Sequence, residues 1–277
     1  MIEIGKWQNL IVVRKKEFGA YLGEQEDSEE TVLLPQKQVD ASLKIGDKIK
    51  VFIYRDSQDR KIATIHTPYI TVGEIGKLKV VSVGKIGAFM DCGLERDVLL
   101  PFKEQTTKVV VGKEYLVFMY VDKSDRLCVT MRLYSHLNLD PPYQKDDYFH
   151  GTVYECKDHM GAFVAVDDQY SGLIPASELF RDLQVGDEVE GRILNVREDG
   201  KMDLSIRRLA YLQMDEDSQE ILKRLEELNG ELPFTDKASP ERIRQEFGMS
   251  KNEFKRAVGR LLKEGKIEIT EQTIRKK

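Results

Sequence analysis

Three short segments of the chain place an aromatic residue directly after two small residues. A glycine and an alanine precede each of Tyr21, Phe89 and Phe163. Aromatic rings flanked by cations stack on the bases of single-stranded nucleic acid, and each stacked base contributes about 1–3 kcal/mol. The triplets alone leave two alternatives open: rings that stack on unpaired bases, or rings that fill a hydrophobic core.

A second candidate for nucleic-acid binding is a concentration of positive charge in the last part of the sequence. The chain of 277 residues is acidic overall, with a formal net charge of −5, but residues 237–277 hold 12 Lys and Arg against six Asp and Glu. Residues 145–209 show the opposite balance, with eight basic and 14 acidic side chains. Clustered cations attract phosphates locally, whereas a solvated surface is the ordinary alternative. We expect moderate binding that weakens with salt.

Patterns of catalysis and metal binding are missing from the sequence. It contains no GxxxxGK[ST] loop, no HExxH and no GxSxG, which are frequent signatures of catalytic sites. The three cysteines, Cys92, Cys128 and Cys156, form no CxxC pair, which predicts buried, reduced thiols in a cytoplasmic protein. The densest apolar run, Leu10 to Val13, is far shorter than the roughly 20 residues of a membrane span. We expect no enzymatic activity, no cofactor, no metal and no membrane association.

The elements that would position the three rings repeat along the chain. A proline follows each triplet, at Pro35, Pro101 and Pro175, and a turn glycine follows each proline by 11 residues. Segments such as 78–83 and 189–196 are rich in β-branched residues, which predicts strands. A unit of roughly 65 to 70 residues with five short strands is typical of a closed barrel of the OB type.

The C-terminal part has a different periodicity, which predicts helices. Apolar residues of the segment 219–228 recur with a period of about 3.6 residues. Ser239 starts a second helix, Ser250 and Glu253 form a capping box for a third, and Gly265 ends that third helix. Two short strands follow, and three helices with a β-hairpin are the order of a winged helix.

These segments resemble known families. The third repeat, with the sequence MGAFVAVDDQYSGLIPASEL, LQVGDEVEGRILNV and DLSIR, resembles the S1-type RNA-binding domain, and SPERIRQEFGMSKNEFKRAVGRLLKEGKIEI resembles a winged helix. Three S1-type repeats followed by a winged helix resemble the conserved virulence factor B family of Gram-positive bacteria, which is associated with RNA binding and gene regulation. The resemblance implies a mainly β fold with a small α+β C-terminal domain. Its expected domains are three tandem five-stranded OB barrels, at 1–68 (diverged), 69–144 and 145–212, and a winged helix at 213–277.

The resemblance also implies which residues contact RNA. S1-type domains use two aromatic residues around the Gly-Ala pair, and an Asp and an Arg near the last loop. The matching aromatic and basic residues of the repeats are Phe18, Tyr21, Arg60, Phe89, Arg126, Phe163, Arg192, Arg197 and Lys201. In the winged helix they are Arg244, Lys251, Lys255, Arg256 and Arg260. Where the family has a histidine, all three repeats have proline, which predicts weaker binding by each repeat.

The sequence thus predicts a monomeric, cytoplasmic protein that binds single-stranded RNA through several weak sites on linked modules. We expect the strongest contribution from the third barrel and the basic helix. Two other functions stay open. The winged helix could read the major groove of double-stranded DNA in a transcription regulator, or the modules could serve as a protein-docking scaffold on RNA machinery.

Overall fold

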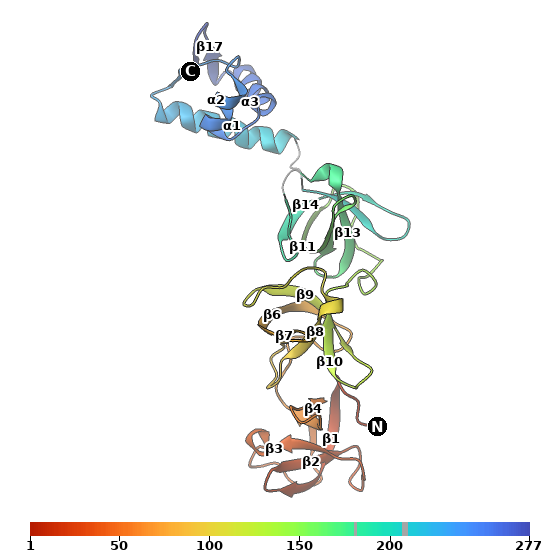
Figure 1. The fold of residues 1–277 in the computed structure, drawn as a ribbon. Coiled ribbons are helices and arrows are strands. Elements are labelled where there is room, and N and C mark those ends of the chain that lie inside the picture. The colour runs from red at the N-terminus through yellow and green to blue at the C-terminus, as the bar shows by residue number, and fades with distance from the viewer. Residues whose placement is uncertain (180–181, 207–209) are drawn as a thin grey trace. The chain divides into compact units, whose positions relative to one another are not determined.

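The computed structural model describes residues 1–179, 182–206 and 210–277. Two compact units make up the chain, Met1–Ile206 and Arg207–Lys277. The first unit contains all the barrel strands, coloured red to green in Figure 1, and the second contains the three α-helices, in blue.

The first unit consists of three closed barrels of five strands each. Barrel 1 is formed by β1 (Trp7–Lys16), β2 (Gly19–Gly23), β3 (Val32–Pro35), β4 (Lys48–Arg55) and β5 (Lys61–Thr64). Barrel 2 is formed by β6 (Ile75–Val83), β7 (Gly87–Asp91), β8 (Val98–Pro101), β9 (Glu114–Val121) and β10 (Leu127–Thr130). Barrel 3 is formed by β11 (Tyr148–Lys157), β12 (Gly161–Val166), β13 (Tyr170–Pro175), β14 (Glu188–Val196) and β15 (Met202–Ser205). Around barrel 1 the strand order is β1-β2-β3-β5-β4, and the corresponding strands have the same order in the other two. The predicted fold class is therefore confirmed.

A short 3-10 helix follows the third strand of every barrel. The three are η1 (Gln36–Gln38), η2 (Phe102–Glu104) and η3 (Ala176–Glu178). For the third repeat the sequence predicts a short helical turn from Ala176 to Phe180; η3 forms its first three residues, and Phe180 lies outside the described residues.

Alternating side chains of the strands fill each barrel. In β2, Ala20 and Leu22 are buried in the core of barrel 1, and Tyr21 between them belongs to the other face of the strand. The first strand of every barrel contains a β-bulge, which bends a strand where a small barrel must close. A bulge between Val12 and Arg14 sets the register so that Arg14 lies opposite Tyr21.

The glycine of each triplet is required by close packing of backbone. Gly19 and Gly161 have positive φ angles of 143° and 119°, and a Cβ atom at either position would overlap a carbonyl oxygen of the neighbouring strand. The prolines that replace the family's histidine lie directly opposite these glycines, as in the pair Gly19 and Pro35. This explains why glycine and proline recur together in the three repeats.

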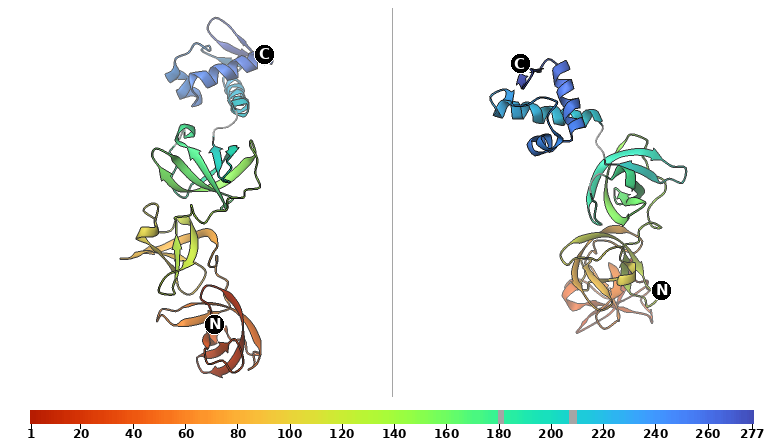
Figure 2. Two further views of the ribbon diagram at one scale, coloured as in Figure 1. Left: turned by 90° about the vertical axis from the view of Figure 1, so that its right-hand side faces the viewer. Right: turned by 45° about the horizontal axis from the view of Figure 1, so that its top comes forward.

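The second unit has the element order predicted for a winged helix. It contains α1 (Ala210–Glu227), β16 (Glu231–Leu232), α2 (Pro240–Phe247), α3 (Lys251–Lys263), β17 (Ile267–Ile269) and β18 (Ile274–Lys276). The helices lie together around one hydrophobic core (Figure 2), and the three strands form a sheet of order β16-β18-β17. Helix α1 begins at Ala210, before the predicted domain start at residue 213.

The cysteines differ from one another in burial. Cys92 and Cys128 are buried as predicted, and burial raises the pKa of their thiols to about 11 and about 12. Cys156 is exposed, so the prediction of a buried thiol is wrong there, because the end of β11 at Cys156 and Lys157 is not covered by the core. The described part of the chain contains no cluster of His, Cys, Asp or Glu that could hold a metal ion. Within it, no helix is both long and apolar enough to cross a membrane.

Candidate nucleic-acid interface

The three aromatic residues of the triplets occupy equivalent places, on the second strand of each barrel and outside its core. Tyr21 lies opposite Leu33, Phe89 opposite Leu99 and Phe163 opposite Leu173, each on the adjacent third strand. None of the three rings belongs to the core of its own barrel. We call the surface formed by the second and third strands the β2–β3 face of each barrel; in OB folds this face binds oligonucleotides.

Barrel 1 combines exposed aromatic rings with cations on this face. The Arg14 guanidinium lies 4.5 Å from the centroid of the Tyr21 ring, and the Lys16 ammonium lies 6.0 Å from it. Phe18, at the tip of the β1–β2 hairpin, is 71% exposed. A half-buried ring held by a cation beside a freely exposed ring is suited to stacking bases and pairing with their phosphates.

The loop between β4 and β5 holds Arg60 near the barrel by hydrogen bonds to Asp56. The Asp56 carboxylate accepts bonds from the backbone amides of Gln58 and Arg60, both at 2.9 Å, and from the Arg60 guanidinium at 2.7 Å. Burial alone would raise the pKa of Asp56, but the hydrogen bonds from Arg60 outweigh it and the pKa is lowered. Asp56 therefore shapes the loop, and Arg60 remains largely exposed.

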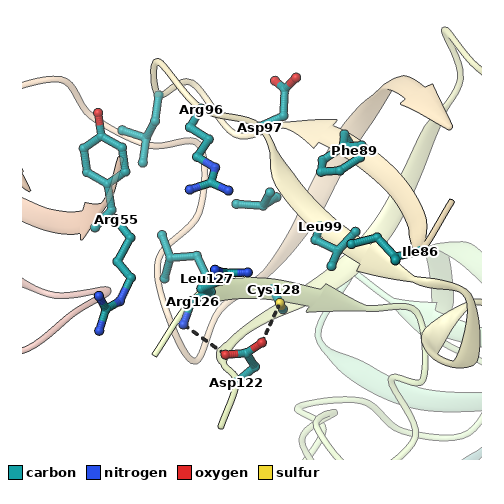
Figure 3. Close-up of a pocket in the computed structure, with 13 residues that line it drawn as sticks. Arg55, Ile86, Phe89, Arg96, Asp97, Leu99, Asp122, Arg126, Leu127 and Cys128 are labelled. Carbon is teal, nitrogen blue, oxygen red and sulfur yellow. Dashed lines mark hydrogen bonds between the residues drawn. The ribbon is translucent and has the colours of Figure 1, made fainter. Parts of the chain in front are cut away.

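In barrel 2 the aromatic ring lines a cavity of about 150 Å³. Phe89, Ile86 and Leu99 lie on one side of the cavity in Figure 3, and Arg55, Arg96 and Arg126 also line it. Arg55 comes from β4 of barrel 1, so the cavity lies where the two barrels meet. Its lining combines apolar side chains with three arginines and two aspartates, Asp97 and Asp122.

The arginines of this cavity also connect barrels 1 and 2. Arg126 Nε donates to Asp59 of barrel 1 at 2.8 Å, and this hydrogen bond lowers the pKa of Asp59. In the other direction, Arg55 Nε donates to the Asp125 carbonyl at 3.0 Å, and Arg96 donates to the Asp56 carbonyl. The predicted contact residue Arg126 is thus half-exposed but engaged in the junction.

Barrel 3 departs from the prediction, because Phe163 is only 6% exposed. Its ring points away from the barrel core, as in the other repeats, but it packs in a separate cluster with Tyr154, Leu133 and Leu137. Leu133 and Leu137 belong to the segment that joins barrels 2 and 3. Phe163 therefore cannot stack a base in this arrangement, and the prediction that it is an exposed platform is wrong.

The three predicted basic contact residues of barrel 3, Arg192, Arg197 and Lys201, are each paired with an acidic side chain. The Arg197 guanidinium bonds to Asp203, and the Lys201 ammonium bonds to Asp199 at 2.6 Å. Arg192 pairs with Asp146 at 2.8 Å, and no described residue provides a hydrogen-bond partner for its buried Nε atom. Opposite the ring of barrel 3 lies Glu155, where barrel 1 has Arg14. The Lys157 ammonium lies 4.9 Å from the centroid of the Phe163 ring, but it pairs with Glu155 at 3.3 Å, which leaves this face less positive than that of barrel 1.

In the second unit, the basic residues of α3 lie on the side of the helix opposite its core side. Phe254, Ala257, Val258 and Leu261 are buried, which leaves the intervening positions to solvent. Lys255 and Arg256 are exposed, and neither forms an ion pair with any side chain that the structure describes. Lys251 is half-exposed at the start of the helix, Arg260 is tied to Glu264 at 2.8 Å, and Arg244 is exposed at the end of α2. The predicted basic surface is therefore present, and Lys255 and Arg256 are its exposed cations in the middle of α3.

The sequence prediction left out the cations that contact the rings from neighbouring strands. Arg14 was recognisable in principle, because the antiparallel hairpin around Gly19 pairs it with Tyr21. Arg55 and Arg96 carried no such signal, since Arg55 reaches the cavity lined by Phe89 from barrel 1 and Arg96 reaches it from the loop between β7 and β8.

The domains define the class of protein: tandem S1-type OB barrels joined to a winged helix, both of which are nucleic-acid-binding domains. The profile of the S1 domain matches residues 4–66 and 72–132. The profile of the second domain of the virulence regulatory factor CvfB matches 138–208, and that of the CvfB-like winged helix domain matches 219–275.

Full-length relatives assign the family. The chain is 32% identical over 275 residues to the uncharacterized protein YitL of Bacillus subtilis, covering 95% of this chain and 90% of that protein. It is 33% identical over 262 residues to conserved virulence factor B of Staphylococcus aureus strain N315, covering 88% and 87%. The chain belongs to the conserved virulence factor B family, as the sequence resemblance predicted.

A solved structure has the same fold. A multidomain protein with nucleic acid binding domains from Streptococcus pneumoniae aligns with 99% of this chain and 98% of its own, at 24% identity and a TM-score of 0.54.

Proposed function

We propose that the chain is a cytoplasmic, non-enzymatic protein that binds single-stranded RNA and thereby regulates gene expression. The observation that carries this proposal is the β2–β3 face of barrel 1, where Phe18 is exposed and Arg14 lies 4.5 Å from the Tyr21 ring. Stacking rings with adjacent cations bind unpaired bases, whereas a base pair in a duplex hides its faces from such rings.

Several weak sites act together in this proposal. Barrel 1 contributes an open aromatic face, barrel 2 a cavity lined by Phe89 and three arginines, and α3 a basic surface. Linked sites add through effective concentration, so that total affinity exceeds that of each module. The expectation that barrel 3 contributes most is not supported by its buried Phe163 and its paired cations.

One observation favours a second candidate function. Helix α3 follows α2 in a helix-turn-helix arrangement, and its exposed side is basic, as in helices that enter the major groove of DNA. The alternative is therefore a double-stranded DNA regulator in which the barrels have another role.

Filter binding of single-stranded RNA over a series of salt concentrations tests the contribution of α3. In the test variant, Lys251, Lys255, Arg256 and Arg260 are changed to Ala. We expect weaker binding. The slope of log affinity against log salt concentration should become shallower by at most roughly 3, since each lost phosphate contact removes about 0.7 from it.

A matched control removes the same charge from exposed lysines of the first unit: Lys44, Lys48, Lys79 and Lys145. It should change the slope less than the α3 variant does. Equal affinity and equal slope of the α3 variant and the unchanged chain would exclude α3 from the RNA site.

A further inference from the structure

A second aromatic ring lies over the buried Phe163 of barrel 3. Tyr134, from the segment between barrels 2 and 3, meets the Phe163 ring edge to face, with 6.3 Å between the ring centroids and an interplanar angle of 82°. Tyr134 is 51% exposed. It therefore presents ring surface to solvent on the face where Phe163 does not.

One cation of the predicted site, Lys201, lies over this tyrosine. The Lys201 ammonium lies 5.3 Å from the centroid of the Tyr134 ring. The pKa of Lys201 is raised, first by its hydrogen bond to Asp199 and next by its interaction with the Tyr134 hydroxyl. Lys201 comes from the same loop of its barrel as Arg60 does in barrel 1. A ring beside a cation is thus formed in barrel 3 as in barrel 1, but with a residue from outside the barrel.

The segment that carries Tyr134 is fixed in place. Leu133 and Leu137 on either side are buried in the cluster around Phe163, and the backbone of His136 and Leu137 donates to the Leu133 carbonyl at 2.8 and 3.2 Å. The His136 ring also stacks on Phe118 of barrel 2, with 3.7 Å between the ring centroids. Displacing the segment would expose several large apolar side chains. The free energy lost by this exposure exceeds the free energy gained by stacking one base on Phe163. Tyr134 is therefore a preorganised surface and not a lid that opens to release Phe163.

We propose that Tyr134 is the base-stacking residue of barrel 3 and takes one unpaired base of single-stranded RNA, with the Lys201 ammonium held against its ring. This inference rests on the proposed RNA-binding function and adds a binding residue to it. The base-stacking ring of barrel 3 is then Tyr134, in the segment that covers β12, and not Phe163 on β12 itself.

The test uses the full chain and a fluorescent, unstructured oligouridine in an anisotropy titration. Tyr134→Ala is expected to weaken binding by about 5- to 150-fold, and Tyr134→Phe to stay within about twofold of the unchanged chain, because the stacking ring is kept. The matched control is Tyr69→Ala, since Tyr69 is a 64% exposed tyrosine in the segment between barrels 1 and 2. It should have little effect on the affinity.

A second measurement on the unchanged chain avoids any effect of the substitution on folding. RNA that contains 4-thiouridine is crosslinked by light, and the peptide that carries Tyr134 should be among those attached. Unchanged or tighter binding by Tyr134→Ala would overturn the inference, and tighter binding would mean that the tyrosine blocks the face. If the unchanged chain bound no RNA, the proposed function would fail and this inference with it.

Discussion

At the scale of residues, one position of the repeat has three different surroundings. Tyr21 is half-buried beside Arg14, Phe89 lines a cavity with arginines, and Phe163 is covered by the segment that precedes its barrel. The strand that bears the ring is the same in each case, so the difference comes from what packs on the β2–β3 face. On the face of barrel 1, Phe18 is 71% exposed and Arg14 lies over the Tyr21 ring.

Replacing Tyr21 should weaken RNA binding without unfolding the barrel. The ring lies outside the core, and its loss removes one stacked base, so we expect Tyr21→Ala to lower the affinity for oligouridine by about 1–3 kcal/mol, roughly 5- to 150-fold. Anisotropy measures this change. Ile45→Ala, in the exposed turn before β4, is the control and should leave the affinity unchanged. Equal binding by both variants would contradict a role for Tyr21.

The Asp56 carboxylate should make the stability of the first unit depend on pH. Its pKa in the folded chain is lowered, so its contribution is present above the ordinary value of about 3.9 and is lost as the pH falls through the lowered value. Asp56→Ala should cost about 1–3 kcal/mol of unfolding free energy at neutral pH, because two loop amides lose their acceptor. Urea denaturation should find a smaller difference at pH values below about 3.

A control separates this effect from a general loss of negative charge. Glu29→Ala, at an exposed acid in the loop before β3, should be close to neutral at either pH. If the loss of unfolding free energy caused by Asp56→Ala did not change with pH, the stabilising role of the ionised Asp56 carboxylate would be contradicted.

The outward direction of the rings was predictable from the sequence, but their exposure was not. Alternation in β12 places Ala162 and Val164 in the core and Phe163 outside it. Exposure depends on residues far along the chain, such as Leu133 and Leu137, that no local pattern connects to the ring. For the same reason the sequence did not predict the positions of Arg55 and Tyr134, whose side chains lie against a neighbouring barrel.

At the scale of elements, helix α3 depends on a capping box. The Ser250 side chain accepts from the backbone amide of Glu253 at 3.3 Å, and the Glu253 carboxylate accepts from the Ser250 amide at 2.7 Å. These bonds satisfy amide groups that the first turn of a helix leaves free. The box therefore fixes the start of the helix that carries Lys251, Lys255 and Arg256.

Removing the cap should destabilise the second unit. Ser250→Ala is expected to lower its unfolding free energy by about 1 kcal/mol, and Ser250→Thr to recover most of this loss. Thermal unfolding followed by helical circular dichroism measures the difference. A Ser250→Ala protein as stable as the unchanged chain would show that the cap contributes nothing.

Strong local signals made most elements predictable. The cap at Ser239 and the box at Ser250 were read correctly, and the strands predicted at 78–83 and 189–196 are parts of β6 and β14. The strand β16 was not predicted, because two residues are too few to show a period. It forms only by pairing with β18 at the far end of the unit.

At the scale of the molecule, ion pairs and apolar clusters join the barrels of the first unit. Arg126 of barrel 2 pairs with Asp59 of barrel 1, and Lys77 of barrel 2 pairs with Glu188 of barrel 3 at 2.5 Å. Packing of one barrel on the next converts equal repeats into unequal binding faces. We therefore expect the three barrels to contribute different amounts to RNA binding.

The central claim is that this chain binds single-stranded RNA through aromatic rings on the barrel faces together with the cations of α3. The most direct measurement is a competition experiment with the full chain, in which labelled oligouridine is challenged with duplex DNA of equal length. We predict that the RNA stays bound under an excess of duplex, and that combining Tyr21→Ala with the four substitutions in α3 releases it. Displacement of the RNA by an equal amount of duplex would contradict the account.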